Sequence, residues 1–299
     1  MTWSLWIILA VVLITLVSGV LLNVTMVVVH AKNRRQRLRT GGYDKIVLTI
    51  TSANALFQIL VTYGGILLYS GVFLLLPDIA LSSFFFMFLS FSDLCFWNTS
   101  WLSICYCLKL VNFSHQVLLW IKSRFSSALS MLLLETILGS FLTNLPFLWA
   151  TIKMPLDNAG NSSVHSYDFG LSFSFIAVKV ILGSFMPFLL TLLCILLSVK
   201  SLLRHIWRIQ KNSSDMKSSQ LEGHIRAVRT MSLLLVLDLI SCAIVMATML
   251  FSLNVGVVLG NLAWIMTLLF PSLQSVILIT GNPKLMKRQK YHDNIEMNK

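Results

Sequence analysis

Charged residues are scarce in this 299-residue sequence. Asp, Glu, Lys and Arg together make up 11% of it, whereas apolar residues make up 57%, and the mean hydropathy is +0.82. About a quarter of the residues of a soluble domain are charged, so this chain has too few to keep a folded surface in water. The sequence predicts an integral membrane protein. Despite a net charge of +12, it lacks the wettable basic face of nucleic-acid-binding modules, and no nucleic-acid partner is expected.

No cysteine lies in a connection expected outside the membrane, where a disulfide could form. The five cysteines are Cys95, Cys105, Cys107, Cys194 and Cys242. All of them lie inside apolar runs, and none is grouped with histidine in a spacing typical of metal sites. We therefore expect no disulfide framework and no bound metal.

Motifs of catalysis are absent as well. The sequence has no nucleophile–base–acid arrangement, zincin motif, phosphate-binding loop or dinucleotide fingerprint. The last apolar run, 257–280, contains no lysine for a retinal Schiff base. We expect no catalytic residue, no enzyme activity and no cofactor, and the retinal-protein class fits poorly.

Long apolar runs dominate what remains, and about 20 such residues span a bilayer as a helix. Seven runs reach this length, at 5–30, 46–70, 83–108, 126–151, 171–199, 228–252 and 257–280. They predict an all-α membrane protein whose residues 1–299 form a single seven-transmembrane domain. The first run is too long for a signal-peptide core and has no basic residues before it, so we expect it to remain in the mature protein.

Lysine and arginine predict how the bundle is oriented. They gather in alternate connections, at 31–45, 109–125 and 200–229, and in the tail from 281. The connections on the other side contain only Lys153. Because basic loops stay in the cytoplasm, we expect the amino terminus outside and the carboxyl terminus inside. Asn161, in an Asn-Ser-Ser sequon, is then the predicted glycosylation site, because it alone of the sequons faces outward between spans.

Two classes of protein suit such a bundle. A receptor needs an outward pocket and a basic inner face. A transporter or channel would use charged groups inside the membrane, and Asp93, Glu135 and Asp238 fall in the middle parts of their runs. Composition and spacing leave both classes open.

Several segments resemble the type 2 (bitter) taste receptors, a family of G-protein-coupled receptors. The run "WNTSWLSICYCLKLVNFSHQVLLWIKSR" is similar to the family's third span and following turn. The matching places are Trp97, Leu102, Tyr106, Lys109, Phe113, Ser114, Trp120, Lys122 and Arg124. "SLLRH" at 201–205, "HIRAVRT" at 224–230 and "PSLQSVILITGNPKL" at 271–285 follow in the family's order. The chain departs from the family pattern in the second span, where Asn54 and Ala55 replace a Ser-Arg pair, and at Gln274, which replaces a histidine.

The resemblance implies a plasma-membrane receptor for small bitter compounds that activates a heterotrimeric G protein with a gustducin-like α subunit. The residues predicted to bind the ligand are Phe84, Phe88, Ser92, Asp93, Lys179, Trp264 and Thr267. Phe84, Phe88 and Ser92 recur every four residues and share a helix face, although aromatic residues there also suit helix packing or lipid contact. Lys179 either extends outward to water or meets a ligand or an acid, of which Asp93 is the natural choice.

The basic inner face is predicted to couple to the G protein. Its residues are Lys109, Arg204, His205, Arg208, His224, Arg226 and Arg229. Arg226 and Arg229, three residues apart, share a helix face. The alternative is that these residues anchor the helices to membrane lipids, because basic groups bind anionic headgroups at the inner surface. We expect an agonist to shift the population toward a state in which spans five and six separate on the inside.

Overall fold

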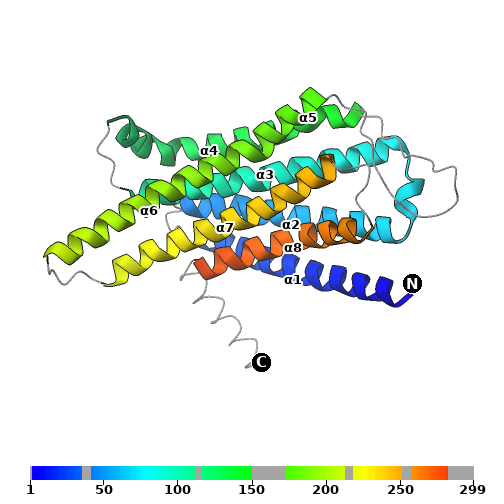
Figure 1. Ribbon diagram of the computed structural model, residues 1–299, viewed down its shortest axis with the longest axis horizontal. Helices are drawn as coiled ribbons and strands as arrows, with labels where there is room; N and C mark the ends of the chain where they lie inside the picture. Colours follow the sequence, from blue (N-terminus) through cyan, green and yellow to red (C-terminus); the bar gives the residue numbers. More distant parts are fainter. Residues whose placement is uncertain are drawn as a thin grey trace.

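The computed structural model describes residues 2–35, 42–111, 116–149, 173–212, 218–250 and 257–281. Within these ranges the chain is almost entirely helical and has no strand. The helices lie side by side in one elongated bundle (Figure 1). This confirms the predicted all-helical class.

The elements in chain order are α1 (Thr2–Arg35), α2 (Gly42–Tyr69), the 3-10 helix η1 (Val72–Leu75), α3 (Asp78–Leu110), α4 (Gln116–Asn144), the 3-10 helix η2 (Leu145–Trp149), α5 (Phe173–Val180), the π-helix η3 (Ile181–Phe185), α6 (Met186–Asn212), α7 (Ser218–Leu250) and α8 (Val257–Gly281). The helices α5, η3 and α6 follow one another without a break and form a single rod. We name the two ends of the bundle by what lies there. The η1 end holds η1 and the start of α3, and the Lys109 end holds the end of α3 and the start of α4.

Six stretches of helix are long and apolar enough to cross a membrane. They are Gly42–Tyr69, Asp78–Leu110, Ser127–Trp149, Ser174–Arg204, Glu222–Ile244 and Ala263–Gly281. In α1 the described apolar part, Val12–Val28, is shorter. A bundle of membrane-spanning helices is therefore established, while a count of seven spans stays a prediction.

Helix α3 lies at the centre of the bundle. It packs against α2, α4, α6, η2 and α7. Its middle is buried on almost every side, and the buried side chains include polar ones such as Ser90, Asn98 and Ser103. The outer faces of the other helices expose large apolar residues, among them Ile14, Leu142 and Trp207. Polar groups inside and apolar groups outside suit a bundle surrounded by lipid.

Hydroxyl residues sit within these helices by bonding to the preceding turn. Thr51 donates to the carbonyl of Val47 over 3.0 Å, and Ser198 donates to the carbonyl of Cys194 over 2.7 Å. Such bonds satisfy a hydroxyl without any outside partner. Apolar spans can therefore carry many Ser and Thr residues.

The helices at the Lys109 end extend beyond the apolar runs, and this corrects the predicted connections. The turn predicted at 109–125 is helical from Gln116 onward, and α6 and α7 reach into the predicted loop at 200–227 as far as Asn212 and from Ser218. The length of an apolar run reflects only the part of a helix that crosses the hydrocarbon layer. A helix continues into water wherever its backbone bonds continue, so the apolar pattern alone does not mark its end.

Candidate ligand site in the helix bundle

A column of aromatic rings joins α2, α3 and α8. Phe84 stacks on Phe88 with ring centres 6.2 Å apart, and Phe88 stacks on Trp264 at 6.3 Å. Phe57 of α2 contacts Phe88 from the side, at 5.5 Å. The four-residue spacing of Phe84 and Phe88 turns both rings to one face of α3, so the predicted shared face is confirmed.

Two glycines of α2 make room for this column. A methyl group added at Gly64 would collide with the ring of Phe84, and one added at Gly65 would lie 2.7 Å from Nε1 of Trp264. The indole therefore rests directly on the backbone of α2. Nε1 of Trp264 is buried and has no hydrogen-bond partner among the described residues, which leaves a donor available inside the bundle.

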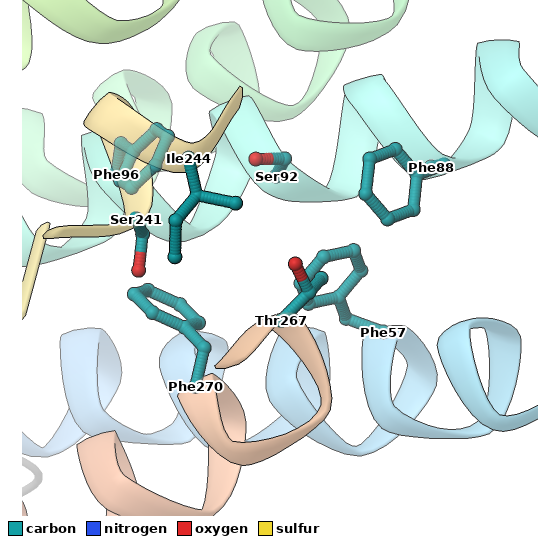
Figure 2. A pocket seen from close by; sticks show the side chains of 8 residues that line it. All are labelled: Phe57, Phe88, Ser92, Phe96, Ser241, Ile244, Thr267 and Phe270. Atoms are coloured by element: carbon teal, nitrogen blue, oxygen red, sulfur yellow. The ribbon is translucent and has the colours of Figure 1, made fainter. Parts of the chain in front are cut away.

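A hollow lies beside the column, between α2, α3, α7 and α8, as Figure 2 shows. The space around it that protein atoms do not fill is about 300 Å³, and this figure includes open solvent beside the hollow. Its lining consists of Phe57, Phe88, Ser92, Phe96, Ser241, Ile244, Thr267 and Phe270. Four phenylalanines and one isoleucine make the walls apolar, and three hydroxyl groups supply the polar points. Small-molecule sites typically combine apolar walls with a few polar groups.

The predicted ligand residues separate into two groups. The first group lies at the hollow: Phe88, Ser92 and Thr267 line it, and Phe84 and Trp264 belong to the column beside it. The hydroxyl of Thr267 donates to the carbonyl of Ala263 over 2.9 Å, so its oxygen remains able to accept a bond. Sequence reasoning missed the other side chains of the lining, because apolar spacing does not distinguish a residue facing a hollow from one facing a neighbouring helix.

Asp93 and Lys179 form the second group, a buried ion pair. Nζ of Lys179 lies 2.9 Å from Oδ1 and 3.2 Å from Oδ2 of Asp93. The side chains are only 5% and 3% exposed, respectively. Asn144 donates from Nδ2 to Oδ2 of Asp93 over 2.7 Å. The suggested pairing of Lys179 with Asp93 is confirmed, and through Asn144 the pair also joins α4. A role of the pair in ligand binding stays a prediction.

The π-helix η3 brings the rod against the ion pair. Pro187 has no N–H to bond the carbonyl four residues earlier, and just before it the N–H of Met186 bonds to the carbonyl of Ile181, five residues back. Gly183 lies within this wide turn, and a side chain added there would collide with the carboxylate of Asp93. Trp97 donates from Nε1 to the carbonyl of Leu182 over 3.2 Å. The sequence signal for this irregular turn was Pro187 inside an apolar run.

A second polar set lies deeper in the bundle, where the chain departs from the family pattern. Gln274 donates from Nε2 to Oγ1 of Thr99 over 2.7 Å, and Ser275 donates to Oδ1 of Asn23 over 2.7 Å. These bonds join α8 to α3 and to α1. Asn54 of α2 accepts a longer bond from Sγ of Cys95, at 3.4 Å. The bond between Asn23 and Ser275 was not predicted, because spacing along one helix does not reveal partners on another.

The three acids considered for transport have different surroundings. Asp93 is bonded to Lys179, and Asp238 is buried in α7 with Oδ1 unpaired among the described residues. Glu135 is exposed on the outer face of α4. An exposed residue on the outer surface does not belong to an interior path, so the three acids do not form one line of interior sites.

The predicted coupling residues are at or near the Lys109 end. Nζ of Lys109 lies 5.4 Å from the ring centre of Tyr43, a cation–π contact between α3 and α2. Arg204 and Arg229 are exposed, and His224 and Arg226 are half-buried. The side chains of His205 and Arg208 and the whole of Asn161 lie outside the described residues.

Long apolar helices packed around a small uncharged hollow define a multi-pass membrane protein with an internal site. The sequence matches the taste receptor protein (TAS2R) family over residues 1–293. The chain therefore belongs to this family, as the resemblance predicted. It is a multi-pass protein of the plasma membrane, and membership implies a receptor rather than an enzyme.

The relatives share moderate identity with this chain. Taste receptor type 2 member 4 of Pongo pygmaeus is 28% identical over 287 residues, which cover 91% of each chain. Member 40 of Gallus gallus is 25% identical over 277 residues, or 90% of this chain and 88% of the relative. Member 41 of Rattus norvegicus is 33% identical over 151 residues, so the match spans about half the length of that relative, 49%.

Proposed function

We propose that the protein is a G-protein-coupled chemosensory receptor that binds small organic bitter compounds in the hollow and activates a heterotrimeric G protein. The observation that carries this proposal is the apolar hollow with three hydroxyl groups in a chain of the taste receptor family. Apolar walls gain free energy by taking apolar ligand surface out of water. The hydroxyls orient a ligand by hydrogen bonding.

The proposed topology has seven spans, with α1 as the first, the amino terminus outside and the carboxyl terminus in the cytoplasm. It is supported by the concentration of Lys and Arg in the connections at the Lys109 end and in the tail. In this orientation the η1 end faces outward, and Asn161 is the glycosylation site. A ligand would then reach the hollow by way of the η1 end.

The proposed ligand contacts are Phe88, Ser92 and Thr267 in the hollow, with Phe84 and Trp264 in the adjoining column. Stacked rings favour a flat ligand, because offset stacking adds attraction beyond the burial of apolar area. Asp93 and Lys179 complete the proposed site at its edge. Ser92, which lines the hollow, directly precedes Asp93 on α3.

The proposed coupling surface lies at the Lys109 end and includes the basic residues of α6 and α7. It comprises Lys109, Arg204, His205, Arg208, His224, Arg226 and Arg229. Helices α6 and α7 enclose the longest inner connection, and we infer that a gustducin-like α subunit inserts between them. The agonist shifts the population toward a state in which these helices separate at that end.

The test is calcium imaging of cells that express the receptor together with a promiscuous G-protein α subunit, against a panel of bitter compounds. We expect at least one compound to raise calcium, and only when the α subunit is present. Ionic current or solute flux in liposomes that contain the protein but no G protein would instead identify a channel or transporter. Measuring receptor at the cell surface shows that a silent result does not come from poor expression.

A further inference from the structure

The hollow has no charged group of its own, although two charges lie close to it. All eight lining residues are aromatic, aliphatic or hydroxyl-bearing. Successive residues of a helix point about 100° apart. Ser92 faces the hollow while Asp93 bonds to Lys179 of α5. The charge next to the lining is therefore directed at another helix.

The two charged groups of this pair bond to each other and neutralise each other. Both carboxylate oxygens of Asp93 lie within 3.2 Å of Nζ of Lys179, and Oδ2 also accepts from Asn144. A side chain added at Gly183 would collide with the same carboxylate, so the backbone of η3 leaves no room for another group there. Both side chains are shielded from water. Neither charge is left over for a third partner.

We propose that the Asp93–Lys179 pair makes the hollow selective for uncharged aromatic compounds; this inference rests on the proposed receptor function. A ligand ammonium would lose its water on entry and find no free carboxylate, and a ligand carboxylate would find no free ammonium. A neutral ring system loses little hydration, stacks against Phe57 and Phe88, and uses the hydroxyls for a single carbonyl, amide or ether group. Asp93 and Lys179 thus determine specificity by neutralising each other.

The test uses matched triplets of compounds on one flat scaffold. Naphthalene and benzene rings each carry a carboxamide, a carboxylate or a trimethylammonium group, so that shape is kept while charge changes. These triplets are added to the bitter panel in the calcium assay. We expect the wild-type receptor to respond to neutral members and to other uncharged aromatic compounds, with at least tenfold weaker responses to both kinds of ion.

Two single variants test the role of the pair, and we expect them to change the charge preference of the receptor in opposite directions. Asp93→Asn leaves the ammonium of Lys179 without its counterion, and we expect it to gain response to the carboxylates. Lys179→Met leaves the carboxylate of Asp93 free, and we expect a gain toward the trimethylammonium compounds. Lys45→Met is the matched control, because Lys45 bonds to exposed Ser130 of α4 and lies far along α2 from the hollow. Its ligand ranking should equal that of the wild type.

The outcomes separate this inference from the proposed function. Charged aromatic agonists that act on the wild type as strongly as neutral ones would overturn the selectivity while leaving the receptor intact. A gain of response to the same kind of ion in both variants would also overturn the proposed role of the pair. Where a variant does not reach the cell surface, the wild-type ranking by charge decides. A surface-expressed wild type that answers no compound, with or without the G protein, would overturn the receptor function and the inference with it.

Discussion

Gln274 of α8 donates a hydrogen bond from Nε2 to Oγ1 of Thr99 over 2.7 Å, and this bond joins α8 to the central helix α3. Both side chains are fully buried. The bond lies where the chain carries glutamine in place of the family's histidine. In an apolar surrounding the donor has no water to replace the hydroxyl, so the pair fixes the relative position of α3 and α8.

Removing the hydroxyl of Thr99 should therefore destabilise the bundle. Thr99→Val keeps the shape but leaves Nε2 of Gln274 buried without an acceptor, at an expected cost of about 1–3 kcal/mol in the free energy of unfolding. Thermal unfolding in detergent measures the loss. Thr280→Val is the control, because among the described residues the hydroxyl of Thr280 bonds to the preceding turn of α8 alone. The hydroxyl of Thr99 makes such a bond within α3 and in addition accepts from Gln274. Equal unfolding temperatures for the two variants would contradict the interhelical contribution.

A methyl group at position 65 should disturb the aromatic column. In Gly65→Ala the added carbon lies 2.7 Å from Nε1 of Trp264, so the indole must move and its stacking on Phe88 is lost. We expect agonist potency to fall at least tenfold, measured from the calcium dose–response curve. Gly139→Ala on α4 is the control, since its methyl group would meet nothing within 4 Å. A control variant that loses potency equally would mean that the column is not responsible.

Breaking the ion pair on one side should cost more than removing it altogether. Asp93→Asn leaves a buried ammonium without its counterion, for which the expected loss of stability is about 3–5 kcal/mol. The double change Asp93→Asn with Lys179→Met removes both charges, and its unfolding temperature should recover most of the loss. The measurement is thermal unfolding of all three variants and the wild type. Additive losses in the double variant would show that the two residues are not energetically coupled.

Glycosylation tests the orientation of the bundle. With the amino terminus outside, Asn161→Gln should abolish the mobility shift produced by glycosidase treatment of the protein from mammalian cells. Asn112→Gln and Asn212→Gln change sequons on the predicted cytoplasmic side and should leave the shift unchanged. A shift that depends on Asn112 or Asn212 would reverse the proposed topology.

Arg226 distinguishes coupling from membrane anchoring. Arg226→Ala should lower the maximal calcium response by half or more without changing the concentration of agonist that gives half of it, because the ligand site is at a distance from this residue. Surface labelling must show the same amount of receptor. Lys45→Ala, on the same side of the membrane, serves as the control. A loss of surface receptor in proportion to the response would identify Arg226 as an anchor.

The sequence was most informative where apolar residues continue over the length of a membrane span. The apolar runs predicted α2 and α3 to within a few residues, at 46–70 and 83–108 against Gly42–Tyr69 and Asp78–Leu110. It was less informative at the connections of the Lys109 end, where α4 begins at Gln116 although its predicted span begins at 126. Solvent-exposed helical turns carry no apolar signal, so their extent could not be predicted from hydropathy.

By itself the sequence determined the membrane environment, the all-helical class and the family, because composition, apolar run length and ordered motifs belong to the chain before it folds. Only the tertiary structure decided which of the predicted residues meet. It paired Asp93 with Lys179, which are 86 positions apart, and it placed Ser92 on the hollow and Glu135 on the outer face of α4. The physical reason is that the spacing of residues along a helix establishes only which of them share a face. The packing of the helices determines how each helix is turned about its axis and therefore what that face meets.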